Sequence, residues 1–157
     1  MITKPIGIIR TPFKTKENMP IQSVGAMDRE GSVEIYEEFV EGLKGLDGFS
    51  HIYLLFEFHK SDGYNLLAKP FLDDEMKGVF ATRAPRRPNG IGLSIVRLIS
   101  VDKNILKIGG VDMLDGTPLL DIKPYVSKFD AIENTSGGWL KDKMHKAEKH
   151  RSDDRFS

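Results

Sequence analysis

The stretch Ser50–His59 alternates apolar and mixed positions with a period of two, which is the repeat of an extended strand. One face is wholly apolar and consists of Ile52, Leu54, Phe56 and Phe58, whereas the opposite face mixes polar and apolar side chains. Such a strand needs a dry surface on one side and tolerates water on the other. The stretch therefore predicts a β-barrel or sheet whose core receives the apolar face.

Several other short apolar runs, bounded by Pro, Gly and Asn, also have strand character. The strands expected from them are Pro5–Thr11, Gly31–Tyr36, Gly78–Arg83, Ile91–Val101, Ile105–Ile108 and Pro118–Tyr125. Residues 37–45 predict one or two helical turns, and residues 61–76 predict a polar loop. Because strands do not alternate with helices, the expected fold class is mostly β, a small antiparallel β-barrel with a short C-terminal helical appendage.

The length of 157 residues fits one domain, and residues 1–135 hold all of the expected strands. Residues 136–157 are highly charged and predict a helix or tail rather than a second domain. This helix is expected to begin at Gly138, with a thin apolar stripe formed by Leu140, Met144 and Ala147.

The composition excludes several classes of chemistry. The chain has no cysteine, which rules out thiol catalysis, disulfide frameworks and cysteine metal sites. His145 and His150 lie five residues apart in the charged tail, where solvated surface is the simpler interpretation, so no metal site is predicted. Neither a secretory signal nor an apolar run of about 20 residues is found, which predicts a soluble, cytoplasmic protein without a membrane segment.

Basic and acidic residues balance at 23 each, so no bulk charge draws the chain to nucleic acid. A local basic patch is present nonetheless, because Arg83, Arg86 and Arg87 bracket Pro85 and Pro88. Prolines restrict the backbone, so the arginine side chains lose less freedom when they bind an anion. The cluster predicts a site for phosphate, carboxylate or an RNA backbone, with a solvated face as the alternative.

A second charged turn runs through Asp115, Gly116, Thr117 and Pro118. These residue types form turns by backbone physics alone, so the motif by itself is a weak sign of function. In the strand that follows, Asp121 and Lys123 share one face, where they form either an exposed ion pair or the lining of a cavity. His59, at the end of its strand, is either a surface histidine or a site residue.

Four segments together resemble the TrmO (YaeB/TsaA-like) family of tRNA adenine N6-methyltransferases. They are Ile6–Phe13, Leu46–His59, Gly78–Ser94 and Asp112–Tyr125, in this order and at compatible spacing. The resemblance implies S-adenosylmethionine as methyl donor, a small antiparallel barrel, and a homodimer with the donor site near the subunit interface. It also explains why the glycine fingerprint of Rossmann-type proteins is missing. The implied substrate is threonylcarbamoyl-adenosine beside the anticodon of a threonine-type tRNA, methylated on N6.

The resemblance also implies roles for individual residues. The donor-binding residues that it indicates are Gln22, His59, Lys60, Arg83, Leu93, Asp115, Gly116, Thr117 and Pro118. The residues expected to contact tRNA are Arg86, Arg87 and Asn89. A carbamoylated nitrogen is a poor nucleophile and benefits from a base or a polarising cation. The catalytic candidates are therefore Asp115, Lys123 and Tyr125.

Two positions depart from the usual pattern of the family, because Gly90 replaces a proline and Ile21 replaces an arginine. These departures loosen one turn and remove one possible RNA contact. Three alternatives stay open: a non-catalytic module that binds S-adenosylmethionine or RNA, a methyltransferase of another small substrate, and a structural oligomer. The last of these does not account for the cluster of arginines and prolines.

Overall fold

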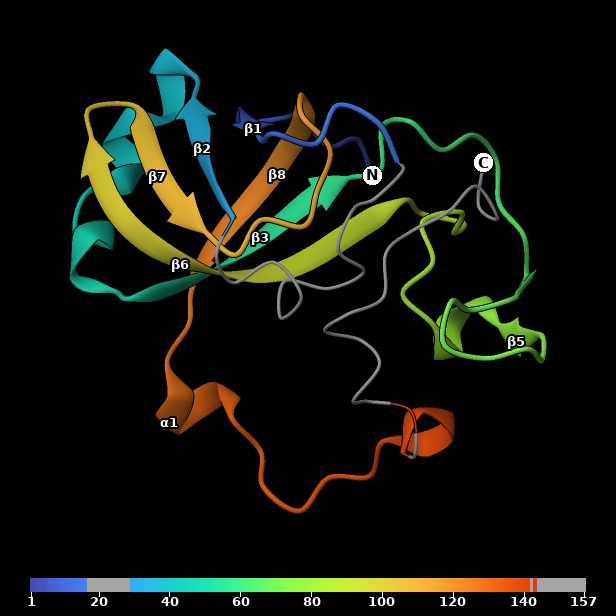
Figure 1. Cartoon of the computed structure of the whole chain (residues 1–157). Helices are drawn as coiled ribbons and strands as arrows, with labels where there is room; N and C mark the ends of the chain where they lie inside the picture. Colours follow the sequence, from blue (N-terminus) through green and yellow to red (C-terminus); the bar gives the residue numbers. More distant parts are fainter. Residues whose placement is uncertain (17–28, 142, 144–157) are drawn as a thin grey trace.

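A computed structural model describes residues 1–16, 29–141 and 143. Within these residues, strands β1, β2, β7, β6, β3 and β8 close, in that order, into an antiparallel barrel (Figure 1). Their bounds are β1 Gly7–Arg10, β2 Glu30–Ile35, β3 His51–Glu57, β6 Ile91–Asp102, β7 Ile105–Gly109 and β8 Thr117–Pro124. The predicted mostly-β barrel is confirmed. None of the helices in the described ranges is long and apolar enough to span a membrane.

The short strand β1 closes the barrel because it pairs on both sides. Gly7 lies opposite Ile35 of β2 and opposite Leu119 of β8. A Cβ atom at Gly7 would collide with the backbone oxygen of Glu34, so the close approach of β1 and β2 requires glycine at this position. Closure leaves the six-stranded sheet without an exposed edge.

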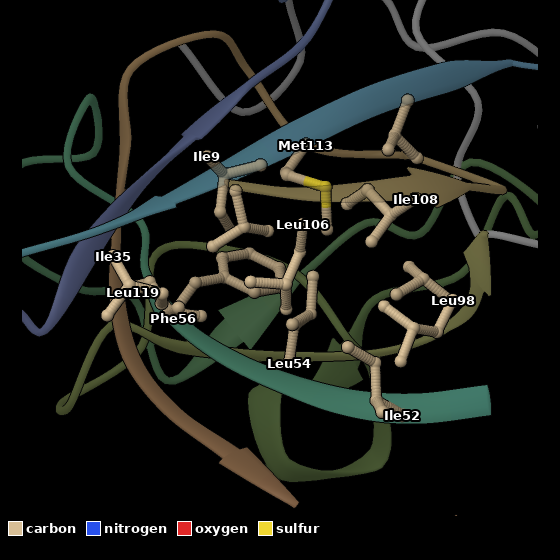
Figure 2. Packing of buried hydrophobic residues seen from close by; sticks show 13 residues of the cluster. Ile9, Ile35, Ile52, Leu54, Phe56, Leu98, Leu106, Ile108, Met113 and Leu119 are labelled. Atoms are coloured by element: carbon tan, nitrogen blue, oxygen red, sulfur yellow. The ribbon is translucent and has the colours of Figure 1, made fainter. Parts of the chain in front are cut away.

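The interior of the barrel is filled by apolar side chains from all six strands (Figure 2). The alternation predicted for β3 is confirmed, since Ile52, Leu54 and Phe56 are buried and point into the core. Gly92 of β6 lies directly opposite Phe56, and a Cβ atom there would collide with the Phe56 ring. The core thus depends on a large side chain facing a residue with none.

The expected strand Gly78–Arg83 is wrong. Only a two-residue strand forms there, β5 Lys77–Gly78, which pairs with β4 Leu67–Ala68 inside the expected polar loop. A 3₁₀ turn, Val79–Ala81, follows, and the Thr82 hydroxyl donates a hydrogen bond of 2.8 Å to the carbonyl of Val79. The strand partner of this segment is the two-residue β4 and not a barrel strand, so the regular pairing ends at Gly78.

Residues 58–90 leave the barrel after β3 and return at β6, and we call this segment the excursion (Figure 1). It encloses only a small apolar cluster, formed by Ala68, Val79 and Ala84. The helical turns expected over residues 37–45 are confirmed as a 3₁₀ helix, Glu37–Leu43, and a second short one, Leu46–Gly48, follows.

The chain beyond β8 forms a short helix, α1 Ser127–Asp130, and then one 3₁₀ turn, Gly138–Leu140. The turn begins where the C-terminal helix was expected, but Met144 and Ala147 lie outside the described residues. The division between residues 135 and 136 stays a prediction.

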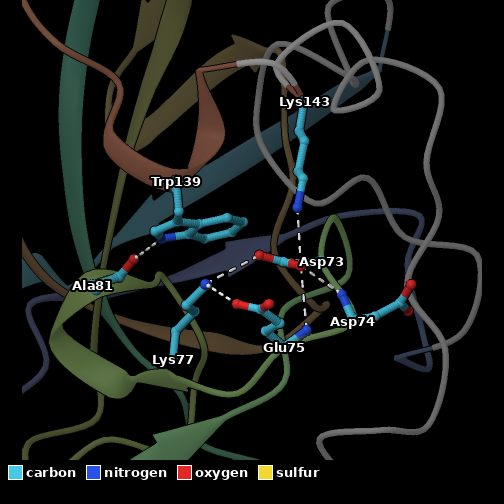
Figure 3. A network of polar contacts seen from close by, with 7 residues as sticks. All are labelled: Asp73, Asp74, Glu75, Lys77, Ala81, Trp139 and Lys143. Carbon is cyan, nitrogen blue, oxygen red and sulfur yellow. Dashed lines mark hydrogen bonds and ion pairs between the residues drawn. The ribbon is translucent and has the colours of Figure 1, made fainter.

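Trp139, in this last turn, docks on the excursion. Its Nε1 donates a hydrogen bond of 2.7 Å to the carbonyl of Ala81, and Lys143 Nζ lies 2.9 Å from the Asp73 carboxylate. Lys77 bridges the same carboxylate at 3.3 Å and lies over the Trp139 ring, 6.0 Å from its centroid (Figure 3). We call these contacts the C-terminal clamp.

Candidate functional site

One end of the barrel gathers three segments that are distant in the sequence. His59 follows β3, Thr117 begins β8, and residues 11–16 follow β1. The Thr117 hydroxyl lies 3.5 Å from His59 Nδ1, so two of the predicted donor-binding segments meet at this end. Antiparallel strands bring the end of one strand beside the start of its neighbour, which explains the meeting of β3 and β8.

The loop that leads into β8, residues 112–117, includes the predicted donor-binding residues Asp115, Gly116 and Thr117, and we call it the donor loop. Several hydrogen bonds fix it to the segment after β1. The Asp115 carboxylate accepts one from the Thr11 amide at 3.0 Å and another from Lys14 Nζ at 2.8 Å. The Thr11 hydroxyl donates to the carbonyl of Met113 at 2.8 Å. Gly116 has a φ of 79°, a left-handed conformation that a glycine adopts at little cost.

The far side of this loop is also held. Buried Ser94 of β6 donates a hydrogen bond of 2.7 Å to the Asp112 carboxylate. The Thr117 hydroxyl donates one of 2.6 Å to the carbonyl of Leu114. A loop fixed at both ends presents its remaining polar groups in one geometry.

Electrostatics set the protonation states at this end of the barrel. The hydrogen bond from Lys14 holds the pKa of the Asp115 carboxyl below its usual range, against an opposing effect of burial. Burial, and then the charge of Lys60, lower the pKa of His59. At neutral pH the site therefore combines an ionised, weakly basic carboxylate with a neutral imidazole.

The other predicted donor-binding residues lie in three further places of the described chain or outside the described residues. Lys60 is exposed, and its carbonyl accepts a hydrogen bond of 3.0 Å from Lys16 Nζ. Leu93 is half exposed on the outer face of β6, close to where β6 begins. Arg83 is exposed and lies just after the 3₁₀ turn rather than at a strand end. Gln22 falls outside the described residues.

The arginine turn, residues 83–89, contains one arginine whose side chain shapes the turn. Arg87 Nη1 donates hydrogen bonds to the carbonyl of Thr82 at 2.8 Å and to that of Ala84 at 3.2 Å. The carbonyl of Arg86 accepts a bond of 3.2 Å from the Asn65 amide, and Asn89 is exposed. A cavity of about 220 Å³ lies between this turn and the end of β3.

The three catalytic candidates do not converge within one protomer. Asp115 precedes β8, whereas Lys123 lies near the opposite end of that strand, about 20 Å away along its length. Lys123 forms the exposed ion pair with Asp121, at 3.0 Å, that was one of the two alternatives. Tyr125 packs edge-on against Tyr53, with ring centroids 5.6 Å apart, also at the far end.

Sequence reasoning missed the residues that hold the donor loop in place. Thr11 and Lys14 follow the first strand in the segment Thr11-Pro-Phe-Lys14, which has no recognisable binding motif. In the sequence, Ser94 fits the alternating pattern of the expected strand Ile91–Val101. Nothing in a single sequence indicates its contact with Asp112. Among the residues described, no three His, Cys, Asp or Glu side chains come together in a way that could hold a metal ion.

Comparison with known proteins gives consistent matches. The model of the tRNA-methyltransferase O N-terminal domain matches residues 8–131. A probable S-adenosyl-L-methionine-binding protein of Pyrococcus abyssi is 56% identical over 153 residues, which cover 98% of this chain and 83% of that relative. The tRNA (adenine(37)-N6)-methyltransferase of Mus musculus is 39% identical over 143 residues, 87% of this chain and 33% of that relative.

A solved structure has the same fold. The crystal structure of TrmO from Pseudomonas aeruginosa superposes with a TM-score of 0.75 at 42% identity, covering 88% of this chain and 62% of that one. This chain therefore spans less than two thirds of the length of that protein and about a third of the mammalian relative.

Proposed function

The chain belongs to the tRNA-methyltransferase O family, and from that membership we propose that it is a cytoplasmic tRNA methyltransferase. It moves the methyl group of S-adenosylmethionine to N6 of an adenosine beside the anticodon. The substrate proposed in detail is threonylcarbamoyl-adenosine in a threonine-type tRNA. The names of the archaeal and mammalian relatives support the donor and the tRNA, respectively.

The observation that carries this proposal is the meeting of His59 and Thr117 at one end of the barrel. Both belong to segments that the family resemblance assigns to the donor, and the ordered loop before Thr117 gives them a fixed frame. Leu93 and Arg83 lie on either side of the excursion's return to β6. A donor bound at this end would contact residues from four segments of the chain.

The proposed reaction is a direct displacement. The S–CH₃ bond of the sulfonium breaks as the N6–CH₃ bond forms, and the N6 proton leaves to an acceptor. Alignment of the two reactants supplies much of the acceleration in such a step. Because its ion pair with Lys14 weakens Asp115 as a base, we assign Asp115 mainly to holding the donor loop.

We also propose a homodimer, in which the outer face of β6 forms the interface. Ile91, Leu93, Ile95 and Ile99 are exposed along this face, and Leu93 is one of the predicted donor contacts. A dimer would cover the apolar stripe and place the donor site beside the partner.

A catalytic role for Lys123 or Tyr125 would require the partner subunit to supply them. Light scattering of the wild type and of Ile95→Lys tests this, and equal masses for the two would contradict the proposal.

A non-catalytic module that binds S-adenosylmethionine is the second candidate. The separation of Lys123 and Tyr125 from Asp115 favours it, because these three catalytic candidates do not come together among the described residues of one protomer. It shares the donor site with the first candidate and differs only in whether a methyl group is transferred.

One experiment separates the two candidates. The protein is incubated with isotope-labelled S-adenosylmethionine and total tRNA, and the labelled nucleoside is identified by mass spectrometry. We expect label on N6 of threonylcarbamoyl-adenosine, and no label with tRNA from cells that lack the threonylcarbamoyl modification. Calorimetric binding of the donor without label in tRNA would favour the binding module, and absence of both would overturn the donor site itself.

A further inference from the structure

The excursion carries an unusual number of exposed large side chains for so small a segment. Tyr64 is 55% exposed and Phe80 is 76% exposed. Three aliphatic or thioether side chains beside them are also exposed: Leu66, Leu67 and Met76. Exposed apolar groups in one segment, with charged residues around them, are typical of a surface that binds a ligand or another macromolecule.

One of the two aromatic residues lies beside the arginine turn in space, and the other lies close to it in the sequence. Tyr64 lines the cavity of about 220 Å³ together with Pro85, Arg87 and Pro88. The amide of its neighbour Asn65 donates a hydrogen bond of 3.2 Å to the carbonyl of Arg86, which fixes this part of the excursion against the turn. Phe80 lies in the 3₁₀ turn that leads, three residues later, to Arg83. Tyr64 is thus close to Arg87 in space, and Phe80 is close to Arg83 in the sequence.

We propose that Tyr64 and Phe80 form a stacking surface for unpaired bases of the tRNA anticodon loop, while the arginine turn binds the adjacent phosphates. This inference rests on the proposed function. Single-stranded nucleic acid is bound by aromatic side chains that stack on bases, combined with cationic groups that follow the backbone. Adenosines beside the anticodon lie in such an unpaired loop, and Tyr64 lies in a cavity near the strand end that leads to His59.

The charge of this surface favours RNA over a second copy of the chain. A two-fold contact through the arginine turn would place four arginines, Arg83 and Arg86 of each copy, in one interface. Like charges placed together oppose association, whereas a phosphate backbone complements them. The apolar stripe of β6 has only Arg97 within it and suits a second copy better.

The C-terminal clamp connects this surface to the chain beyond β8. Trp139 bonds to the carbonyl of Ala81, the residue directly after Phe80 (Figure 3). Asp73 joins the two lysines of the clamp, Lys77 and Lys143, so the excursion is tied at two points. A surface ordered before binding loses less conformational entropy when RNA docks.

The test uses an anticodon stem-loop in which 2-aminopurine replaces one loop base, because its fluorescence is quenched when it stacks on an aromatic ring. The variants are Tyr64→Ala and Phe80→Ala, with the ring-retaining Tyr64→Phe and Phe80→Tyr. Phe129→Ala is the matched control, since Phe129 is 79% exposed but lies on α1, outside the excursion. The same stem closed by a short stable tetraloop serves as the RNA control.

We expect each alanine variant to raise the Kd for the stem-loop by roughly 5- to 150-fold, as the loss of one stacked base implies. Quenching should be lost in the variant that lacks the ring on which the labelled base stacks. The salt dependence of binding should keep its slope, because no phosphate contact is lost. Tyr64→Phe, Phe80→Tyr and Phe129→Ala should bind and quench like the wild type.

Three outcomes would overturn the proposal. They are wild-type affinity and quenching in both alanine variants, no preference of the wild type for the anticodon loop over the tetraloop, and a change in light-scattering mass instead of RNA affinity. The last would assign the surface to a second copy of the chain.

If the wild type labels N6 while the alanine variants keep their affinity, the stacking surface fails and the proposed function stands. If the variants lose affinity while no label is transferred, the proposed function fails and the stacking surface stands.

Discussion

The barrel and the excursion are held together by different physical means. Within the described residues, thirteen buried apolar side chains form the core of the barrel, whereas the hydrophobic cluster of the excursion consists of three small side chains, Ala68, Val79 and Ala84. Directional contacts replace burial in the excursion: the two bonds from Arg87, the bond from Trp139, and the ion pairs of Asp73. The barrel therefore supplies stability, while the excursion is positioned by a few contacts that single substitutions can remove.

This difference matters for the proposed function because the candidate donor site lies where the two regions meet. His59 follows a barrel strand and begins the excursion, and Leu93 lies just inside the barrel strand where the excursion ends. Burying one large aliphatic side chain stabilises a fold by about 1.5–3 kcal/mol, whereas a neutral hydrogen bond contributes about 0.5–1.5 kcal/mol. Substitutions in the excursion should thus alter binding geometry without unfolding the protein.

The strongest test of the comparison removes a large side chain from each region. Leu106→Ala should lower the free energy of unfolding by about 2–5 kcal/mol, because Leu106 is fully buried in the barrel core. Leu67→Ala, the same substitution at an exposed position of the excursion, should change it by about 0.5 kcal/mol or less. Urea denaturation followed by circular dichroism measures both, and similar losses would mean that the excursion belongs to the cooperative core.

A second prediction concerns the shape of the arginine turn. Arg87→Ala should weaken tRNA binding about tenfold or more while sparing donor binding, since a charged donor to two carbonyls contributes about 1.5–3 kcal/mol. Arg87→Lys keeps the charge without the planar fork, so most of the loss should persist. Filter binding at several salt concentrations measures the affinity, and wild-type affinity in the lysine variant would show that charge alone suffices.

The two other arginines of the turn, Arg83 and Arg86, are expected to differ in the ligands that they bind. Arg86→Ala should lower tRNA affinity and flatten its salt dependence if it contacts one phosphate. Arg83→Ala should in addition weaken donor binding, because the resemblance assigns Arg83 to the donor. Calorimetry with S-adenosylmethionine separates the two variants, and equal donor affinity in both would remove Arg83 from the donor site.

A smaller effect is expected when the clamp is opened. Trp139→Phe removes the hydrogen bond to Ala81, and amide exchange at Val79 and Thr82 should become up to about tenfold faster. Exchange in β3 and β6 should stay unchanged, because the barrel does not rely on this contact. Hydrogen exchange read by mass spectrometry tests this, and faster exchange throughout the barrel would contradict the separation of the two regions.

The smallest expected effect is a pH dependence at the junction. Because the pKa of His59 is lowered in the folded protein, the folded state binds fewer protons at this residue than the unfolded state does. Its contribution to stability is therefore complete above the ordinary histidine pKa of about 6.5 and is lost as pH falls through the lowered value. The difference in Tm between wild type and His59→Asn should shrink between pH 7.5 and 5.5, and a difference independent of pH would show that folding leaves the pKa of His59 unchanged.

The sequence predicted the barrel well because burial dictates a period of two. In β3 the apolar face and the buried face coincide, and the expected strands around 5–11, 31–36, 91–101, 105–108 and 118–125 all form. The segment 78–83 has the same strand-like composition but lies outside the barrel. Its conformation depends on contacts from Arg87 and Trp139, which local composition does not encode.

The site was predictable only in part. The family resemblance indicated His59 and Thr117, and the structure brings them within 3.5 Å of each other. The ion pair of Asp115 with Lys14 joins residues that are far apart in the sequence, so the role of Asp115 could not be inferred from the turn motif. The separation of Asp115 from Tyr125 follows from the length of β8 alone, because Asp115 precedes this strand and Tyr125 follows it. The expected strand Pro118–Tyr125 already implied it.

The closure of the barrel by β1 has a consequence for how the protein reaches its native state. Gly7 of the first strand pairs with Leu119 of the last strand, so the barrel closes only after both strands have formed. Contacts of such large sequence separation make folding slow, because the entropy of closing the intervening chain is lost before the pairing is gained. On the ribosome, β1 would leave the exit tunnel long before its second neighbour, with its backbone groups exposed to other chains. Its brevity, at four residues, limits the length of unpaired edge that is open to aggregation during that interval.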